Sequence, residues 1–292
     1  MELLARQLVE GFITGLHKSP FHGFSAEFSE HRIYNKGEST RHIDWKLFAR
    51  TDKFFIKRYE EETNLRCRIL IDVSSSMLFP FEKNSIQNKL AFSAYTASAI
   101  IYLLQKQRDA VGLTFFSDNI ELHTESKSST IHLKYLYQEL NKILKKENYQ
   151  LEKNTSISDV LHEIAEKIHK RSLVIIFSDM ISDANFDEVF SALQHLRYNK
   201  HEVILYHVVD KSLEIDLEYS NRPYKFVDLE SGRTLKLNPN EVRDLFKKKS
   251  TQVFEELQLK CAQYKIDLVE ADIKADFKEV LIPYLLKRQS LY

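Results

Sequence analysis

Glycine, proline and cysteine are scarce in this chain: among 292 residues there are six Gly, five Pro and two Cys. So few glycines leave no GxxxxGKS/T or GxGxxG loop, which excludes nucleotide-binding sites of those types. Cys67 and Cys261 lie far apart without a CxxC spacing, which argues against a zinc site or a disulfide scaffold. The low glycine and proline content also indicates that flexible linkers are few.

Net charge is absent as well, since 42 Lys and Arg residues balance 42 Asp and Glu residues. A general nucleic-acid binder needs a basic surface for phosphate, so we expect no nucleic-acid partner. No apolar run approaches the ~20 residues that a membrane-spanning helix needs. The first residues also lack the basic flank and apolar core of a signal peptide. We therefore expect no membrane span and a cytoplasmic location.

Apolar runs and helical patterns alternate from about residue 67 onward. Runs typical of buried strands occur at 68–73, 111–116, 173–177 and 202–208, with shorter ones at 120–122 and 266–269. Helical periodicity predicts helices at 85–107, 131–145, 158–169, 186–197 and 239–262, and from about 276. Such alternation indicates βαβ units, so we predict an α/β fold with a doubly wound, mostly parallel sheet and helices on both faces.

Two segments depart from this alternation. Residues 224–237 predict a β-hairpin that turns at Ser231-Gly232, within an insertion at about 213–238. Residues 1–66 hold four of the six glycines, the only tryptophan and many aromatics, without clean periodicity. We therefore predict a partly irregular N-terminal lobe at 1–66, packed on a main domain at 67–292 that contains the hairpin insertion.

Oxygen-bearing side chains follow the first predicted core strand in the pattern Asp72-x-Ser74-x-Ser76. Ligands of open parallel sheets bind outside the carboxyl ends of the strands, where this loop would lie. Thr155 precedes a predicted helix and Asp179 ends another predicted strand, so both are expected at the same edge. Carboxylates and hydroxyls are hard donors that suit Mg²⁺, with Mn²⁺ or Ca²⁺ as alternatives. The pattern predicts a site for one divalent cation.

Two carboxylates would leave a divalent cation near neutrality, while hydroxyls quench its charge poorly. Such an ion favours a carboxylate from outside, so we predict binding to a partner protein that presents an acidic residue. Two other interpretations stay open. Asp and Ser after a strand are also common helix caps, which would make this a metal-free structural module. A metal-dependent phosphatase of the haloacid dehalogenase type also places Asp after its first strand, but its general acid would stand where Ser74 does.

The five predicted ligand positions resemble the metal-ion-dependent adhesion site of von Willebrand factor A domains. The resemblance covers about residues 67–210, and it implies a fold of that type. It also implies that the serines of the first loop bind the metal directly. Thr155 would bind it directly or through water, and the two aspartates mainly through water.

The N-terminal part resembles a second, bacterial family, called domain of unknown function 58. The matching segments are YNKGE at 34–38, RHIDWK at 41–46, Ala49-Arg50 and KRYEEE at 57–62, followed by Lys89, DAVG at 109–112 and the hairpin FVDLESG at 226–232. Glu38 replaces the usual Asp, and the segment 210–214 also departs from the family pattern. Members are commonly encoded beside MoxR-type AAA+ ATPases. The resemblance therefore implies an adaptor of such an ATPase and not an enzyme.

Charged residues surround the single tryptophan in the segment 41–46. Arg41 and Asp44 could form a charge network around Trp45 that clamps the N-terminal lobe. The alternative is a partner-docking surface, because Trp and Arg are enriched at binding hot spots. Both interpretations of Arg41, Asp44 and Trp45 stay open at the level of the sequence.

Overall fold

The computed structural model describes residues 1–15, 31–33, 45–57, 65–80, 88–145, 157–180, 186–229 and 232–290. The chain divides into two compact units, one formed by residues 1–15 with 65–292 and the other by residues 16–64. This division differs from the predicted lobe at 1–66, because the first helix belongs to the same unit as the sheet.

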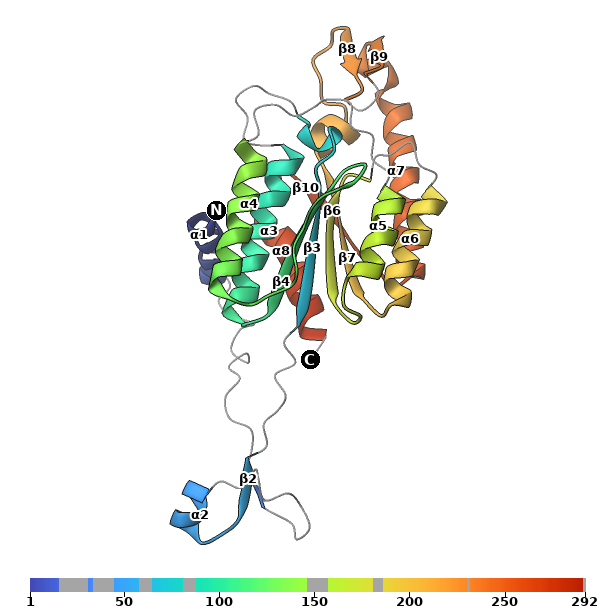
Figure 1. Ribbon diagram of the computed structural model, residues 1–292. Helices are drawn as coiled ribbons and strands as arrows, with labels where there is room; N and C mark the ends of the chain where they lie inside the picture. The colour runs from blue at the N-terminus through green and yellow to red at the C-terminus, as the bar shows by residue number, and fades with distance from the viewer. Residues whose placement is uncertain are drawn as a thin grey trace. The chain divides into compact units, whose positions relative to one another are not determined.

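The larger unit is built on a six-stranded sheet with the strand order β10-β7-β6-β3-β4-β5 (Figure 1). Its strands are β3 (Arg66–Asp72), β4 (Ala110–Phe116), β5 (Ile120–His123), β6 (Leu173–Ser178), β7 (Glu202–Val209) and β10 (Asp267–Asp272). Neighbouring strands pair in parallel, except that β5 runs antiparallel to β4. The predicted mostly parallel sheet is thus confirmed.

Helices cover both faces of this sheet, as predicted for a doubly wound fold (Figure 1). One face carries α5 (Ile157–Lys167), α6 (Phe186–Tyr198) and α7 (Pro239–Gln263). The other side carries α3 (Lys89–Lys106), α8 (Phe277–Ser290), α4 (Thr130–Lys145) and α1 (Glu2–Gly15). Central strands buried on both faces need apolar side chains at successive positions. This explains the apolar runs Ile69-Leu70-Ile71 in β3 and Leu173–Phe177 in β6.

Helix α1 is a regular element within the segment predicted as a partly irregular N-terminal lobe. Ala5 and Val9, one helical turn apart, are fully buried, and the helix packs on α3. The hydroxyl of Tyr102 on α3 donates to a carboxylate oxygen of Glu10 at 3.4 Å. Residues 1–15 therefore contribute to the core of the larger unit.

Two small antiparallel sheets lie outside the six-stranded one. In the larger unit, β8 (Tyr224–Val227) pairs with β9 (Thr234–Leu237), which is the hairpin predicted at 224–237. Gly232 has φ 68°, a value that favours glycine in the turn. In the smaller unit, β1 (His31–Ile33) pairs with β2 (Phe55–Lys57), and α2 (Trp45–Thr51) lies between them in the sequence.

The helices of the described ranges are not long and apolar enough for any of them to span a bilayer.

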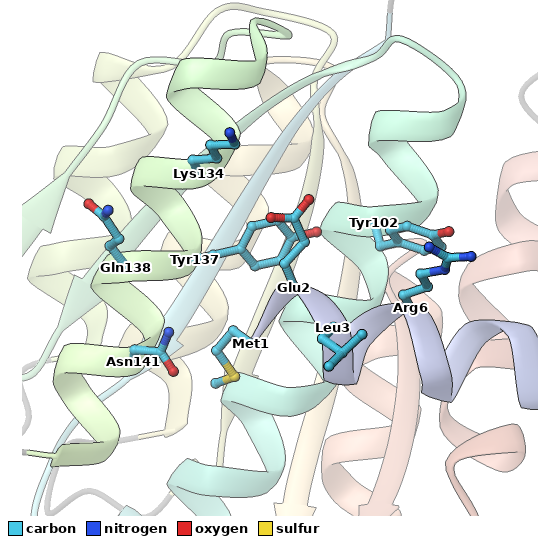
Figure 2. A pocket seen from close by; sticks show the side chains of 9 residues that line it. All are labelled: Met1, Glu2, Leu3, Arg6, Tyr102, Lys134, Tyr137, Gln138 and Asn141. Carbon is cyan, nitrogen blue, oxygen red and sulfur yellow. The ribbon is translucent and has the colours of Figure 1, made fainter.

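A surface groove of about 640 Å³ lies between α1, α3 and α4 (Figure 2). The groove is lined by Met1, Glu2, Leu3, Arg6, Tyr102, Lys134, Tyr137, Gln138 and Asn141. None of these residues belongs to the predicted cation site, so the two features are separate.

Candidate metal centre

The polar cluster, which is the group of polar side chains around Asp72 and Asp179, lies where the chain connections on the sheet diverge. Strand β3 leads through α3 to β4 on one side, while its other neighbour is β6. The carboxyl ends of β3 and β6 therefore border a topological switch point, which is the usual ligand position in open α/β sheets. Asp72 is the last residue of β3, and Asp179 follows the last residue of β6. The fold thus brings two predicted ligands to one edge.

Asp72 joins these two strand ends through hydrogen bonds. Its Oδ1 accepts from the backbone N–H of Ser74 at 2.9 Å, and its Oδ2 accepts from the hydroxyl of Ser178 at 2.7 Å. The hydroxyl of Ser178 in turn accepts from the backbone N–H of Met180 at 3.0 Å. The first loop and the end of β6 are thereby held in one hydrogen-bonded network.

The two serines of the first loop present neighbouring hydroxyls. The Oγ atoms of Ser74 and Ser76 lie 3.0 Å apart, and both side chains are buried. A short 3₁₀ helix (Ser76–Leu78) follows immediately, and the backbone N–H of Val73 donates to the carbonyl of Phe116 in β4 at 2.8 Å. This backbone bond ties the loop to the sheet, which fixes the position of both hydroxyls.

Asp179 is held by a buried lysine. The Nζ of Lys89, the first residue of α3, donates to Asp179 Oδ2 at 2.7 Å and to Glu214 Oε1 at 2.6 Å. Glu214 lies in a π-helical turn, η3 (Lys211–Ile215), that follows β7. Its other carboxylate oxygen accepts from the backbone N–H of Asp210 at 2.8 Å. Lys89 therefore connects the end of β6 with the segment that leads to the hairpin.

Burial and charge both act on the ionisable groups of the cluster. Burial, followed by the negative charge of Asp179, raises the pKa of Asp72 to about 7, although hydrogen bonds from Ser74 and Ser178 act in the opposite direction. Burial alone would lower the pKa of Lys89, but Asp179 and Glu214 outweigh it and the pKa is raised. Two carboxylates are thus kept close together, with an ammonium beside only one of them.

The predicted ligands divide into those that the structure describes and those that it does not. Asp72, Ser74, Ser76 and Asp179 all lie in the described cluster, where their side chains are at most 8% exposed. Thr155 lies outside the described residues, two positions before the start of α5 at Ile157. The role of Thr155 as a metal ligand therefore remains a prediction.

The predicted partner-binding residues lie in the smaller unit. Arg41 and Asp44 are outside the described residues. Trp45 begins α2 and is 59% exposed, with edge-on contacts to the rings of Phe48 at 6.1 Å and Phe54 at 6.4 Å. The indole therefore combines an exposed surface with a supporting aromatic cluster, and its predicted role in partner binding stays a prediction.

Three members of the cluster were not among the predicted site residues. Ser178 precedes Asp179 and follows an apolar run, so a hydroxyl at that position was a usable signal. The sequence indicates Lys89 only through the family resemblance. Its contact with Glu214 spans 125 positions in the sequence. No local pattern reports a contact of that range, so Glu214 had no signal of its own.

The donor chemistry of the cluster fits a hard divalent cation. Among the described residues, no group of three or more His, Cys, Asp or Glu side chains could hold a metal ion, so a cation here would depend on serine hydroxyls as well. Adjacent ligands of an octahedral Mg²⁺ ion are separated by about 3 Å when the bonds are 2.0–2.1 Å long. The separation of 3.0 Å between the Ser74 and Ser76 hydroxyls matches that spacing.

Known proteins share this fold and parts of the sequence. The structure aligns with an aerotolerance-related membrane protein from Bacteroides fragilis with a TM-score of 0.51 and 15% identity, covering 77% of this chain and 99% of that one. This likeness shows the fold alone. Uncharacterized proteins of Mycobacterium bovis and Mycobacterium tuberculosis are 20% identical over 210 residues, which is 72% of this chain. The chain spans 63% of the length of these relatives.

Taken together, the sheet and the polar cluster define an α/β protein with a candidate cation site at the switch point of a mostly parallel sheet. The family model described as "Protein of unknown function DUF58" matches residues 30–255, which is more than half of the chain. The chain belongs to this family. The family resemblance predicted from the N-terminal segments is thereby confirmed, and the predicted sheet with two helical layers is the one observed.

Proposed function

We propose that this protein is a binding module that uses one divalent cation to bind an acidic residue of a partner protein. The observation that carries the proposal is the convergence of Asp72, Ser74, Ser76 and Asp179 at one buried edge of the sheet. We expect Mg²⁺, with Mn²⁺ or Ca²⁺ as alternatives, because every donor is a hard oxygen.

The residues of the cluster have separate tasks under this proposal. Asp72 and Asp179 supply negative charge, while Ser74 and Ser76 supply neutral oxygens that leave the charge of the ion only partly compensated. When bound, the cation offers an electrophilic position to a carboxylate from outside. Ser178 and the backbone N–H of Ser74 orient the carboxylate of Asp72 through their hydrogen bonds.

We further propose a MoxR-type AAA+ ATPase as the partner and the cytoplasm as the location. Membership of the family supports this choice. The resemblance to that family implies a protein encoded beside such an ATPase. The sequence contains neither of the two glycine-rich phosphate-binding patterns, so ATP hydrolysis would belong to the partner. This protein would then act as an adaptor and not as an enzyme.

The test compares Ser74 with Ser117, two buried serines that follow the neighbouring strands β3 and β4. Ser74→Ala and Asp72→Ala should abolish the rise in melting temperature caused by Mg²⁺ and weaken Mg²⁺-dependent binding to a purified MoxR-type ATPase. Ser117, which follows β4 and is also fully buried, provides the matched control, and Ser117→Ala should retain both effects.

Three results would contradict this proposal. Equal binding by Ser74→Ala and the natural protein in Mg²⁺ would remove the role of the first loop. Turnover of phosphoesters that is lost in Asp72→Asn would instead support the phosphatase alternative. A melting temperature that does not respond to divalent cations would favour the metal-free module.

One observation favours that metal-free alternative. The ammonium of Lys89 already neutralises part of the charge of Asp179, at an Nζ–Oδ2 distance of 2.7 Å. An internal cation of this kind lowers the need for a bound ion. The carboxylate of Asp72 accepts hydrogen bonds from Ser74 and Ser178 but forms no ion pair with another described residue. Because its negative charge is not neutralised in this way, we place the metal-dependent function first.

A further inference from the structure

Lys89 carries a positive charge inside the candidate metal centre. Its side chain is completely buried, although lysine is almost never fully buried without a partner. Its Nζ lies 2.7 Å from Asp179 Oδ2 and 2.6 Å from Glu214 Oε1, and these contacts keep the ammonium charged in spite of its burial. A buried cation therefore shares one carboxylate with the predicted ligand set.

The charges of the cluster can be counted for the state with a cation bound, because a bound cation would displace the proton from a carboxyl group with a raised pKa. In that state Asp72, Asp179 and Glu214 contribute three negative charges and Lys89 contributes one positive charge, which leaves a net charge of −2. One divalent cation would neutralise this cluster. Buried charge is costly unless it is compensated. The affinity for an ion should therefore depend on how closely its charge balances the net charge of the cluster.

Within the described part of the chain, two charged or titratable neighbours of the cluster leave this count unchanged. Asp210, which caps η3, forms an ion pair with Lys274 at 3.0 Å and so adds no net charge. His207 lies close to Asp179 and Lys89, and burial lowers the pKa of its imidazole, which favours the uncharged form. Lys89 is thus the residue that sets the cluster at −2 and not at −3.

We propose that Lys89 is a specificity-determining residue of the metal centre. Its ammonium reduces the negative charge of the cluster, so that the cluster prefers a divalent cation to a trivalent one. This inference rests on the proposed function, since it assumes that the cluster binds a cation. Glu214 contributes to the same charge balance, because it accepts a second hydrogen bond from the ammonium and links it to η3.

The experiment measures how each variant chooses between ions of similar radius and different charge. Mn²⁺ and Lu³⁺ have similar ionic radii, so the ratio of their affinities, measured by calorimetry in a non-coordinating buffer, reports on charge and not on size. Lys89→Met should raise the preference for Lu³⁺ about tenfold or more, because a unit charge a few ångströms from the ion is removed. Glu214→Gln should lower the preference by a similar factor of about ten.

The double variant Lys89→Met/Glu214→Gln separates charge from folding. It removes the ammonium and one carboxylate together, so the cluster returns to a net charge of −2 without bringing two unpaired carboxylates face to face. Its ion preference should return to within about threefold of the natural protein. If Lys89→Met does not fold, Glu214→Gln and the double variant decide the question.

A matched surface pair serves as the control. Lys142 and Glu139 also form an ion pair at 2.6 Å, but the lysine side chain is 69% exposed on α4. Lys142→Met and Glu139→Gln should leave the ion preference unchanged. Variants of Lys89 and Glu214 that bind Mn²⁺ and Lu³⁺ in the natural ratio would overturn this inference alone. A natural protein that binds neither ion would overturn both this inference and the proposed function.

Discussion

The two central strands, β3 and β6, each contain two regions that are equally buried and chemically opposite. Over most of their length they present apolar side chains such as Ile69, Leu70 and Ile175, all with no exposed surface. At their carboxyl ends they present Asp72 and Asp179, which are 0% and 2% exposed. Burial alone therefore does not distinguish core from site in this protein. The difference is that burying apolar groups stabilises the fold, whereas burying charges costs several kcal/mol per ion unless they are compensated.

The largest expected effect on stability comes from the apolar region. Leu173 is the first residue of β6, pairs with Cys67 of β3 and is fully buried. Leu173→Ala should lower the free energy of unfolding by about 2–5 kcal/mol, since it leaves a cavity in a packed core. Urea denaturation with and without Mg²⁺ measures this loss, and the increment caused by Mg²⁺ should be unchanged. A smaller increment would show that the two regions are not independent.

The polar region should behave in the opposite way. Asp72→Asn removes the repulsion from Asp179 and retains an oxygen for the N–H of Ser74, so in chelator its stability should lie within about 1 kcal/mol of the natural protein. The stabilisation by Mg²⁺ should be lost. Asp109 is another buried aspartate, and it is not part of the cluster. It accepts a hydrogen bond of 3.0 Å from the backbone N–H of Leu65. Asp109→Asn should keep the Mg²⁺ response. A loss in Asp72→Asn as large as in Leu173→Ala would identify Asp72 as structural.

The smallest effect concerns a buried histidine at the opposite end of the sheet. Burial lowers the pKa of His201, whose Nδ1 accepts from the backbone N–H of Ser172 at 3.2 Å. A base with a lowered pKa in the folded state contributes stability above its unfolded pKa of about 6.5, and this stability is lost as the pH falls through the lower folded value. Stability should therefore decline below about pH 6.5. His201→Asn, which keeps an acceptor for Ser172, should show a shallower decline in melting temperature. If the melting temperature of this variant declines as steeply as that of the natural protein, the pH dependence does not arise from His201.

Most elements of the larger unit could be predicted from the sequence, because buried parallel strands and long helices carry strong local patterns. The predicted strand at 173–177 is observed at Leu173–Ser178, and the helix predicted at 239–262 is observed at Pro239–Gln263. Helix α1 was missed because its buried positions, Ala5 and Val9, stand next to a glycine- and aromatic-rich segment that obscures the period. Local patterns fail where irregular and regular segments adjoin.

The candidate site was predictable only in part, for a different reason. The strand-end rule places Asp72, Ser74, Ser76 and Asp179 together, because each lies at or just after the end of a strand. Lys89 begins a helix, a position where lysine is ordinarily solvated, so its complete burial cannot be read from neighbouring residues. The contacts of its ammonium, 90 and 125 positions away in the sequence, arise only from the tertiary fold.

If the proposed cation site binds its ion, the ion pair between Lys89 and Glu214 makes that site and the hairpin segment thermodynamically dependent on each other. Glu214 lies in η3, which begins the connection from β7 to β8, so any ligand that displaces η3 also changes the environment of Asp179. Coupling of this kind is reciprocal. A partner that binds the hairpin and shifts η3 would alter the affinity for the ion by some factor, and the ion would alter the affinity for that partner by the same factor.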